Sequence, residues 1–373
     1  MEIKNEVLVD LLDAAMAADY TRVKRLGSEI ARLLADNDQP EAARKVRALM
    51  RKRGVPLQAS GFAEALPVDA GSRLPLVEEQ DWPVTPLFVN EQTQGVLQRF
   101  LGDAQNVDLL SDKGLSPRLS LLLSGPPGTG KSLLAGHVAA HLGKPLFVAR
   151  LDSLISSRLG ETAKNIRGAF EYVPARGAVL FLDELDAIAK LRDDRHELGE
   201  LKRVVNTVIQ GLDSLDSHSV VIAATNHAHL LDSAIWRRFP YKIEMNFPDE
   251  DVRASMWLHF LYEDDREREH EAQILSQLSE GISGADIENL AFTVRRQSLL
   301  QDIPINLATL AWAVYASRKG PFYLPPQSLD PDQKRELATY LANLSDIKKM
   351  DIAEIVGVSR QMVARYLKEA SDG

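Results

Sequence analysis

One short stretch of this chain, residues 121–132, restricts the possible folds more than any other. It reads LLLSGPPGTGKS, in which an apolar run is followed by a turn rich in glycine and proline, and the periodic segment LLAGHVAAHL comes next. The three parts predict a strand, a loop and a helix. Their spacing is that of the phosphate-binding loop G-x-x-x-x-G-K-[ST], in the strand–loop–helix context that this motif requires. The alternative is a glycine-rich turn without a ligand, and the Lys-Ser pair argues against it.

The residue types in this loop match the chemistry of a bound phosphate. Glycine at positions 125, 128 and 130 lets backbone N–H groups turn inward around phosphate oxygens, since side chains there would block the approach. Lys131 is expected to reach the β- and γ-phosphates of ATP, and Ser132 to bind Mg²⁺. The N-terminus of the following helix adds a favourable dipole. The predicted nucleotide-binding residues of the loop are Gly125, Pro126, Pro127, Gly128, Thr129, Gly130, Lys131, Ser132 and Leu133.

Length and composition narrow the class of protein. With 373 residues the chain is expected to hold two or three domains. The 53 acidic and 44 basic residues give a net charge of −9, which argues against a surface built throughout for nucleic acid. The absence of cysteine excludes disulfides, thiolate zinc sites and cysteine nucleophiles. The first residues lack the features of a signal peptide, and no run approaches the roughly 18 apolar residues of a membrane span. We therefore expect a cytoplasmic protein without membrane contact.

Changes of pattern divide the chain into five parts. Helical spacing of apolar residues predicts an N-terminal helical bundle over 1–53, and the proline-containing segment 54–84 reads as a linker or as an arm along the next domain. Residues 85–248 alternate strand and helix, which predicts an α/β domain with a parallel sheet covered by helices on both faces. Residues 249–319 are helical, and 320–373 form a small helical C-terminal domain after a stiff Gly-Pro break.

Two further strands of the predicted sheet end in polar residues. Asp183 and Glu184 follow the apolar run 178–182. Asp183 suits Mg²⁺ binding, and Glu184 suits the activation of an attacking water. The alternative is a solvated acidic turn, because Asp186 follows closely, but the phosphate loop about 50 residues upstream favours the catalytic reading. The run 220–225 ends at Asn226, which could bond the water and the γ-phosphate together or simply begin a turn.

Five motifs in order, GPPGTGKS, FLDELDAIA, AATN, LLDSAIWRRF and GISGADIENL, resemble the AAA family of AAA+ ATPases. The resemblance covers about residues 85–318. It implies a P-loop AAA+ core followed by a helical lid at 249–319, and a homo-oligomeric ring, commonly a hexamer, with nucleotide between neighbouring subunits.

The resemblance also assigns residues. It makes Asn226 a sensor of the γ-phosphate, and it places arginine fingers at Arg237 and Arg238, in an Arg-Arg-Phe run similar to that of the katanin and spastin branch. A guanidinium supplied by one subunit would neutralise charge on the phosphoryl group bound in the next. Gly284 and Ala285 match small residues that pack near the nucleotide in the family.

Two features leave the substrate open. The pore-facing loop of the family usually presents an aromatic residue, but Arg158 stands at that position in this chain. This departure puts the threading of protein through the pore in doubt. An arginine there could instead bind acidic segments or a phosphate backbone. Residues 347–368 resemble a helix-turn-helix with Gly357 at the turn. Its outward residues would be Arg360, Gln361, Ala364, Arg365 and Lys368. Because five basic and five acidic residues balance over 345–373, DNA contact and protein docking are both open.

The combined expectation is a Mg²⁺-dependent ATPase that assembles into a ring and remodels or regulates a protein partner. A DNA-associated regulator or loader acting through the C-terminal helices is the alternative. A third possibility is a switch that controls a separately encoded effector such as a protease.

Overall fold

The computed structural model describes residues 66–69, 73–154, 161–190, 198–317, 325–344 and 347–371, together with single residues among the first 46. The chain divides into two compact units, Met1–Leu66 and Pro67–Gly373. The predicted N-terminal bundle over 1–53 lies largely outside the described residues, and so do 54–65 and 70–72 of the predicted linker or arm 54–84. So does the loop that carries Arg158. The fold below is that of the second unit.

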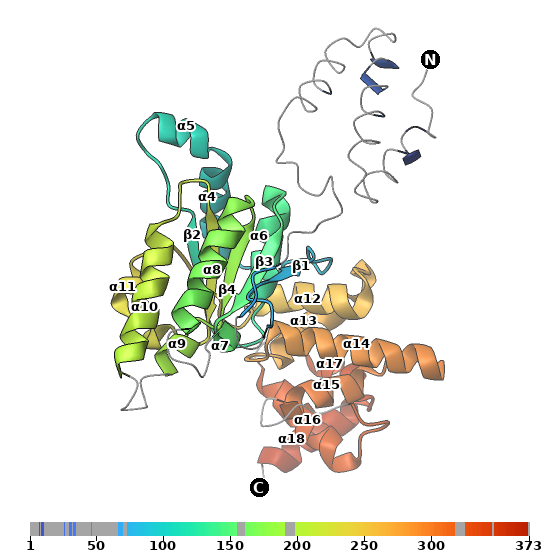
Figure 1. Ribbon diagram of the computed structural model, residues 1–373. Coiled ribbons are helices and arrows are strands. Elements are labelled where there is room, and N and C mark those ends of the chain that lie inside the picture. Colours follow the sequence, from blue (N-terminus) through green and yellow to red (C-terminus); the bar gives the residue numbers. More distant parts are fainter. Residues whose placement is uncertain are drawn as a thin grey trace. The chain divides into compact units, whose positions relative to one another are not determined.

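A β-sheet forms the centre of the α/β part of this unit (Figure 1). It has six strands in the order β1-β3-β4-β5-β2-β6. The strands are β1 (Glu78–Gln80), β2 (Ser120–Ser124), β3 (Leu146–Arg150), β4 (Val179–Asp183), β5 (Val220–Thr225) and β6 (Tyr241–Glu244). Only β1 is antiparallel to its neighbour, β3. β2 and β5 are buried at every position, as expected for central parallel strands with both faces covered.

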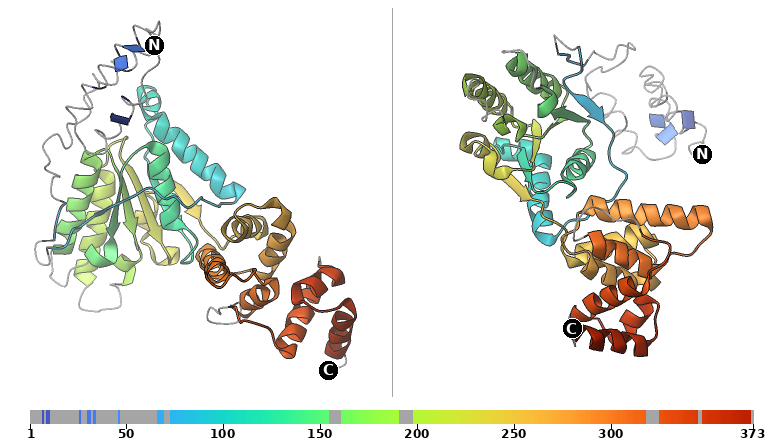
Figure 2. Two further views of the ribbon diagram at one scale, coloured as in Figure 1. Left: turned by 90° about the vertical axis from the view of Figure 1, so that its right-hand side faces the viewer. Right: turned by 90° about the horizontal axis from the view of Figure 1, so that it is seen from below.

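Helices lie on both sides of this sheet, as Figure 2 shows. The helices of this part are α4 (Glu91–Gln105), α5 (Val107–Asp112), α6 (Lys131–Leu142), α7 (Leu151–Leu154), α8 (Glu161–Ala175), α9 (Ala187–Lys190), α10 (Leu198–Asp213) and α11 (Ser233–Trp236). Apolar side chains of α4 and α6 share a core with the strands, among them Phe100 and Leu134, while α8 packs against α10 and β4. The prediction of an α/β fold with helices on both faces of a parallel sheet is confirmed, except that the edge strand β1 is antiparallel.

The rest of the unit is helical. It contains α12 (Glu250–Tyr262), α13 (Glu269–Leu278), α14 (Gly284–Gln301), α15 (Leu307–Ser317), α16 (Pro331–Asn343), α17 (Lys349–Val356) and α18 (Arg360–Ser371). Buried side chains from Trp257 in α12 to Tyr366 in α18 form one continuous core. The last helices therefore pack onto those before them.

Local sequence explains where several helices begin. The side chain of Asn90 accepts a hydrogen bond from the N–H of Thr93 at the start of α4, and Asp249 and Ser283 cap α12 and α14 in the same way. α16 starts with a complete capping box between Asp330 and Gln333. These caps fix the first turns of the two helices, α12 and α14, that border the candidate site.

Candidate active site

Three predicted motifs meet at one edge of the sheet because the strands that carry them are neighbours. β2 lies between β5 and β6, and β5 lies between β2 and β4, so the phosphate loop, Asn226 and the pair Asp183–Glu184 all follow the carboxyl ends of adjacent parallel strands. The ends of parallel strands are where ligands of such sheets bind. A cavity of about 400 Å³ opens there.

Most of the residues predicted for binding and catalysis line this cavity. It is bordered by Pro127, Gly128, Thr129, Gly130, Lys131, Ser132, Leu133, Asp183, Glu184, Asn226, Gly284 and Ala285. Gly125 and Pro126 lie just before the lining part of the loop, and Arg237 and Arg238 are not part of the lining. The structure thus brings together residues that are up to 158 positions apart in the chain.

The start of the phosphate loop is fixed by close backbone approach. Gly125 donates its N–H to the carbonyl of Thr225 at 3.2 Å, and Met245 donates its own to Ser124 at 2.7 Å. Gly125 has φ +147°, and a Cβ on it would lie 2.0 Å from the carbonyl oxygen of Met245. Only glycine fits at this position.

Replacing Gly125 with alanine is therefore expected to lower the free energy of unfolding by about 3 kcal/mol, since a backbone clash adds to an unfavourable φ. Urea-induced unfolding measures the loss. Gly143→Ala is the matched control, because Gly143 also has positive φ but open space around its Cβ position. Its expected loss is about 1 kcal/mol. Equal losses for the two variants would contradict the importance of the close approach.

Lys131 is held inside the loop. Its side chain is 8% exposed, and Nζ donates to the carbonyl oxygens of Gly125 at 2.8 Å and Pro126 at 2.7 Å. Burial lowers the pKa of Lys131, and the negative charges of Asp183 and Asp186 partly oppose this. The ammonium group is therefore positioned at the cavity, where phosphate oxygens could replace the two carbonyls as acceptors.

The acidic pair at the end of β4 has an unusual backbone. Glu184 adopts φ +55°, a left-handed conformation that non-glycine residues rarely adopt, and its N–H donates to Oδ1 of Asp183 at 2.9 Å. The next residue, Leu185, donates its N–H to the carbonyl of Ala224 in β5 at 2.9 Å. Strained conformations of this kind cluster at functional sites. Here the strained turn brings the Glu184 side chain to the cavity lining.

Asp186 has a structural role that sequence reasoning missed. It is 1% exposed and accepts hydrogen bonds from Oγ1 of Thr225 at 3.0 Å and from the N–H of Asn226 at 3.1 Å. The carboxylate of Asp186 thus ties the loop after β4 to the end of β5. A solvated acidic turn is the wrong description of this residue. The second aspartate of FLDELD is the sequence feature that could have indicated this role. The residues that donate hydrogen bonds to it lie about 40 positions away, so the local pattern does not identify them.

Asn226 lines the cavity next to this tie. Its side-chain oxygen is buried and has no hydrogen-bond partner within the described part of the chain. Buried amide oxygens are normally bonded, so an unbonded one at a cavity wall is consistent with a place for a ligand or a water molecule.

Helix α14 closes over the loop through small residues. Ala285 donates its N–H to the carbonyl of Gly128 at 3.1 Å. A Cβ on Gly128 would lie 2.6 Å from Oγ of Ser283, and one on Gly284 would lie 2.7 Å from Cε of Met256. The small residues predicted near the nucleotide are therefore the ones that allow the two segments to touch.

The other end of the cavity is largely apolar. It is formed by the segment 85–88 and by Met256 and Phe260 of α12. The rings of Phe88 and Phe260 meet edge to face, with centroids 5.6 Å apart. A carbonyl-to-imidazole contact of 2.8 Å between Thr85 and Nε2 of His137 ties this segment to α6. The cavity therefore has a polar end suited to phosphates and an apolar end suited to a base.

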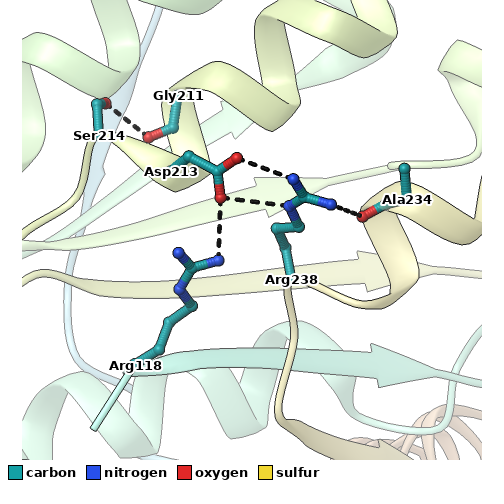
Figure 3. Close-up of polar contacts among 6 residues, drawn as sticks. All are labelled: Arg118, Gly211, Asp213, Ser214, Ala234 and Arg238. Atoms are coloured by element: carbon teal, nitrogen blue, oxygen red, sulfur yellow. Dashed lines mark hydrogen bonds and ion pairs between the residues drawn. The ribbon is translucent and has the colours of Figure 1, made fainter. Parts of the chain in front are cut away.

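The two arginines predicted as fingers lie away from this cavity. Figure 3 shows Arg238 bound to Asp213, with Nε donating to Oδ1 at 3.2 Å and Nη2 to Oδ2 at 3.0 Å. Arg238 also donates to the carbonyl of Ala234 at 3.2 Å, and Arg118 donates to the same Asp213 at 3.1 Å. Arg237 is exposed at the end of α11. Neither arginine is placed to act on the cavity of its own chain.

The oxygen donors at the polar end of the cavity suit Mg²⁺. Ser132 and Asp183 both line the cavity and offer a hydroxyl and a carboxylate oxygen, the ligand types that Mg²⁺ prefers. No group of three or more histidine, aspartate or glutamate side chains suited to a metal occurs among the described residues. The set therefore fits an ion that keeps several waters and is shared with phosphates, as Mg²⁺ does in nucleotide sites.

Residues 121–247 match the family model for the ATPase family associated with various cellular activities, abbreviated AAA. An uncharacterized AAA family ATPase of Sinorhizobium fredii is 46% identical over 154 residues, which make up 41% of this chain and 47% of that relative. The ATP-dependent zinc metalloprotease FtsH 3 of Sphaerobacter thermophilus is 36% identical over 174 residues, 45% of this chain and 36% of the relative. The proteasome-activating nucleotidase of Methanopyrus kandleri is 28% identical over 256 residues, 66% of this chain and 59% of the relative.

These matches concern part of each protein, since the chain spans about half the length of the curated relatives it matches. None of the helices within the described ranges has the length and apolar character needed to cross a membrane. The matched region contains the phosphate loop, the acidic pair and Asn226, which the structure gathers around one cavity. In sequence and in the arrangement of these motifs around one cavity, residues 121–247 of this chain are therefore similar to an ATPase domain of the AAA family.

Proposed function

We propose that the cavity binds ATP with Mg²⁺ and hydrolyses it. The observation that carries this proposal is the meeting of Lys131, Asp183 and Glu184 at the ends of neighbouring strands around a 400 Å³ cavity. The loop N–H groups and Lys131 would hold the phosphates, while Ser132 and Asp183 would hold the metal. Bound Mg²⁺ would supply charge neutralisation on the phosphate oxygens.

Within this proposal Glu184 is the general base. Its carboxylate would orient a water molecule and accept its proton, and the strained backbone at φ +55° places that carboxylate at the cavity wall. Asn226 would bond the same water or the terminal phosphate through its side-chain amide. Asp186 would act as a positioning residue, because it bonds the N–H of Asn226.

We further propose that a neighbouring subunit completes the site in a homo-oligomeric ring, commonly a hexamer. Arg237 and Arg238 lie outside the cavity of their own chain, which a role in trans would require. A guanidinium that reaches the terminal phosphate of the next subunit would make hydrolysis depend on assembly. The likeness of this Arg-Arg-Phe run to the katanin and spastin branch remains a prediction.

The work driven by hydrolysis is proposed to be the remodelling or regulation of a protein partner. One relative of the matched domain is named a proteasome-activating nucleotidase and another an ATP-dependent zinc metalloprotease, and these names support a protein partner for this chain. The partner of this chain could likewise be a separately encoded effector. The Arg158 loop, which could contact that partner, lies outside the described residues.

Affinity capture with Glu184→Gln tests this function. With ATP bound but not hydrolysed, the variant should hold its partner, whereas Lys131→Ala, which removes the phosphate-binding cation, should not. A protein enriched only by Glu184→Gln with ATP, and remodelled by the wild type, would support the proposal. Wild-type protein without ATP turnover, alone or with the captured protein, would contradict it.

A second candidate function is DNA binding through the C-terminal helices. α17 is followed by Gly357, which has a left-handed conformation, and then by α18, and both helices pack against α16. The buried residues of α18 include Val363 and Tyr366, while all five predicted contact residues, Arg360, Gln361, Ala364, Arg365 and Lys368, are exposed. This arrangement favours the second helix as the contacting one.

Duplex DNA binding at low salt tests this candidate. A helix that contacts phosphates should lose affinity steeply as salt rises, and Arg360→Ala with Lys368→Ala should weaken binding at every salt concentration. Arg365 already donates to Glu369 at 2.7 Å, so Arg365→Ala is expected to have the smaller effect. Absence of binding at low salt would remove DNA and leave protein docking as the role of these helices.

A further inference from the structure

One charged side chain in the cavity has no part in the chemistry proposed above. Besides Lys131, Asp183 and Glu184, the lining contains Glu288 of α14. Glu288 is half-buried, and no hydrogen bond or ion pair links its side chain to any residue that the structure describes. A carboxylate that faces a ligand cavity without a partner can accept hydrogen bonds from a ligand.

The position of Glu288 along α14 indicates which part of a nucleotide it would meet. Gly284 and Ala285 lie against the phosphate loop, where Ala285 bonds Gly128. Glu288 follows these residues by four and three positions, so it lies on the same face about one helical turn, or 5 to 6 Å, further from the phosphates.

Two cavity-lining residues of helix α12 are also one helical turn apart, and the second lies further from the phosphate loop. Met256 packs near Gly284, close to the phosphate loop, and Phe260 follows one turn later at the apolar end beside Phe88. A nucleotide whose phosphates occupy the loop and whose base contacts the aromatic rings must place its ribose between these two ends. Glu288 is the charged residue of the lining at that level.

We propose that Glu288 binds the ribose of the nucleotide by accepting hydrogen bonds from its 2′ and 3′ hydroxyl groups. Those hydroxyls are donors, and an ionised carboxylate only accepts, so the pairing is complementary. Removal of one hydroxyl would leave the half-buried carboxylate with fewer donors, which disfavours deoxyribonucleotides. The inference rests on the proposed nucleotide binding and adds selection for the sugar.

Calorimetric titration of the full chain with diphosphates tests this pairing without hydrolysis. Wild-type protein is expected to bind ADP about tenfold or more tightly than 2′-deoxyADP or 3′-deoxyADP, the range for hydrogen bonds to a charged group. In Glu288→Ala the preference should fall to about twofold or less, mainly through weaker ADP binding. Asn289→Ala, at the exposed next position of α14, should keep the wild-type preference.

The outcomes separate this inference from the proposed function. No binding of ADP or ATP by the wild type would overturn nucleotide binding itself. Binding of ADP without preference over the deoxy forms, or a preference that survives Glu288→Ala, would overturn only the role of Glu288. A Glu288→Ala variant that no longer distinguishes ADP from GDP but keeps its preference for ribose would likewise overturn the role of Glu288 in binding the sugar. Glu288→Gln, which keeps one acceptor oxygen, should show an intermediate preference and serves if the alanine variant does not fold.

Discussion

Glu184→Gln is expected to reduce ATP turnover by about 100- to 10,000-fold, the usual contribution of a general base, while ATP binding changes by less than about threefold. The amide of glutamine has nearly the shape of the carboxylate but cannot accept the proton of the attacking water. Glu184 has no proposed role in holding phosphates, so the binding constant should remain. Steady-state phosphate release and equilibrium binding of ATP measure the two quantities separately.

Glu171→Gln is the matched control for this substitution. Glu171 is exposed on α8, away from the cavity, and the same change of charge there should leave turnover unaltered. Turnover that persists in Glu184→Gln while ATP still binds would show that another group activates the water.

Alanine substitution of either finger candidate should lower turnover by about 1,000-fold, within the range for an arginine that acts on a transferring phosphoryl group, and ATP binding should be retained. The two residues are expected to differ in their effect on the chain itself. Arg238→Ala also removes the paired hydrogen bonds to Asp213, whereas Arg237 is exposed.

Asp213→Asn separates a role in the neighbouring subunit from a role within the chain. The hydrogen bond from Arg238 lowers the pKa of Asp213, and Arg118 contributes further, so the carboxylate mainly serves these two arginines. If Arg238 acts in trans, Asp213→Asn should cost turnover much less than Arg238→Ala does. Equal losses in the two variants would mean that Arg238 matters only as an anchor for α10. Arg266→Ala, a charge change outside the cavity lining, provides the control.

Local patterns in the sequence predicted the sheet and the polar end of the cavity. β2, β4 and β5 are short apolar runs followed by polar motifs, and each motif directly follows its strand. In a parallel sheet such motifs gather at one edge whatever the details of packing, so Lys131, Glu184 and Asn226 could be placed together in advance.

Features that depend on distant contacts could not be predicted in this way. Asp186 reads as one more acid in a turn until β5 supplies Thr225 and Asn226 as donors. Asp213 bonds Arg238 across 25 positions and Arg118 across 95. Glu288 lines the cavity because α14 packs against the phosphate loop. Secondary-structure propensity and residue spacing do not reveal such long-range contacts.

The resemblance to AAA proteins gave the order of the motifs and the small residues at the start of α14. It gave no reason for the pairing of Arg238 with Asp213, nor for the carboxylate at Glu288. The domain boundaries drawn from the sequence remain predictions. So do the N-terminal bundle, which lies largely outside the described residues, and the Arg158 loop, which lies outside them.

The central claim is that ATP is hydrolysed at this cavity with arginines supplied by a neighbouring subunit. Mixing two inactive proteins tests it most directly: Glu184→Gln, which keeps both arginines, and the double variant Arg237→Ala with Arg238→Ala, which keeps Glu184. In a head-to-tail ring about one interface in four would pair an intact Glu184 with intact arginines, so the mixture should recover turnover well above the sum of its parts. A mixture that forms rings yet turns over ATP no faster than the separate variants would contradict the claim.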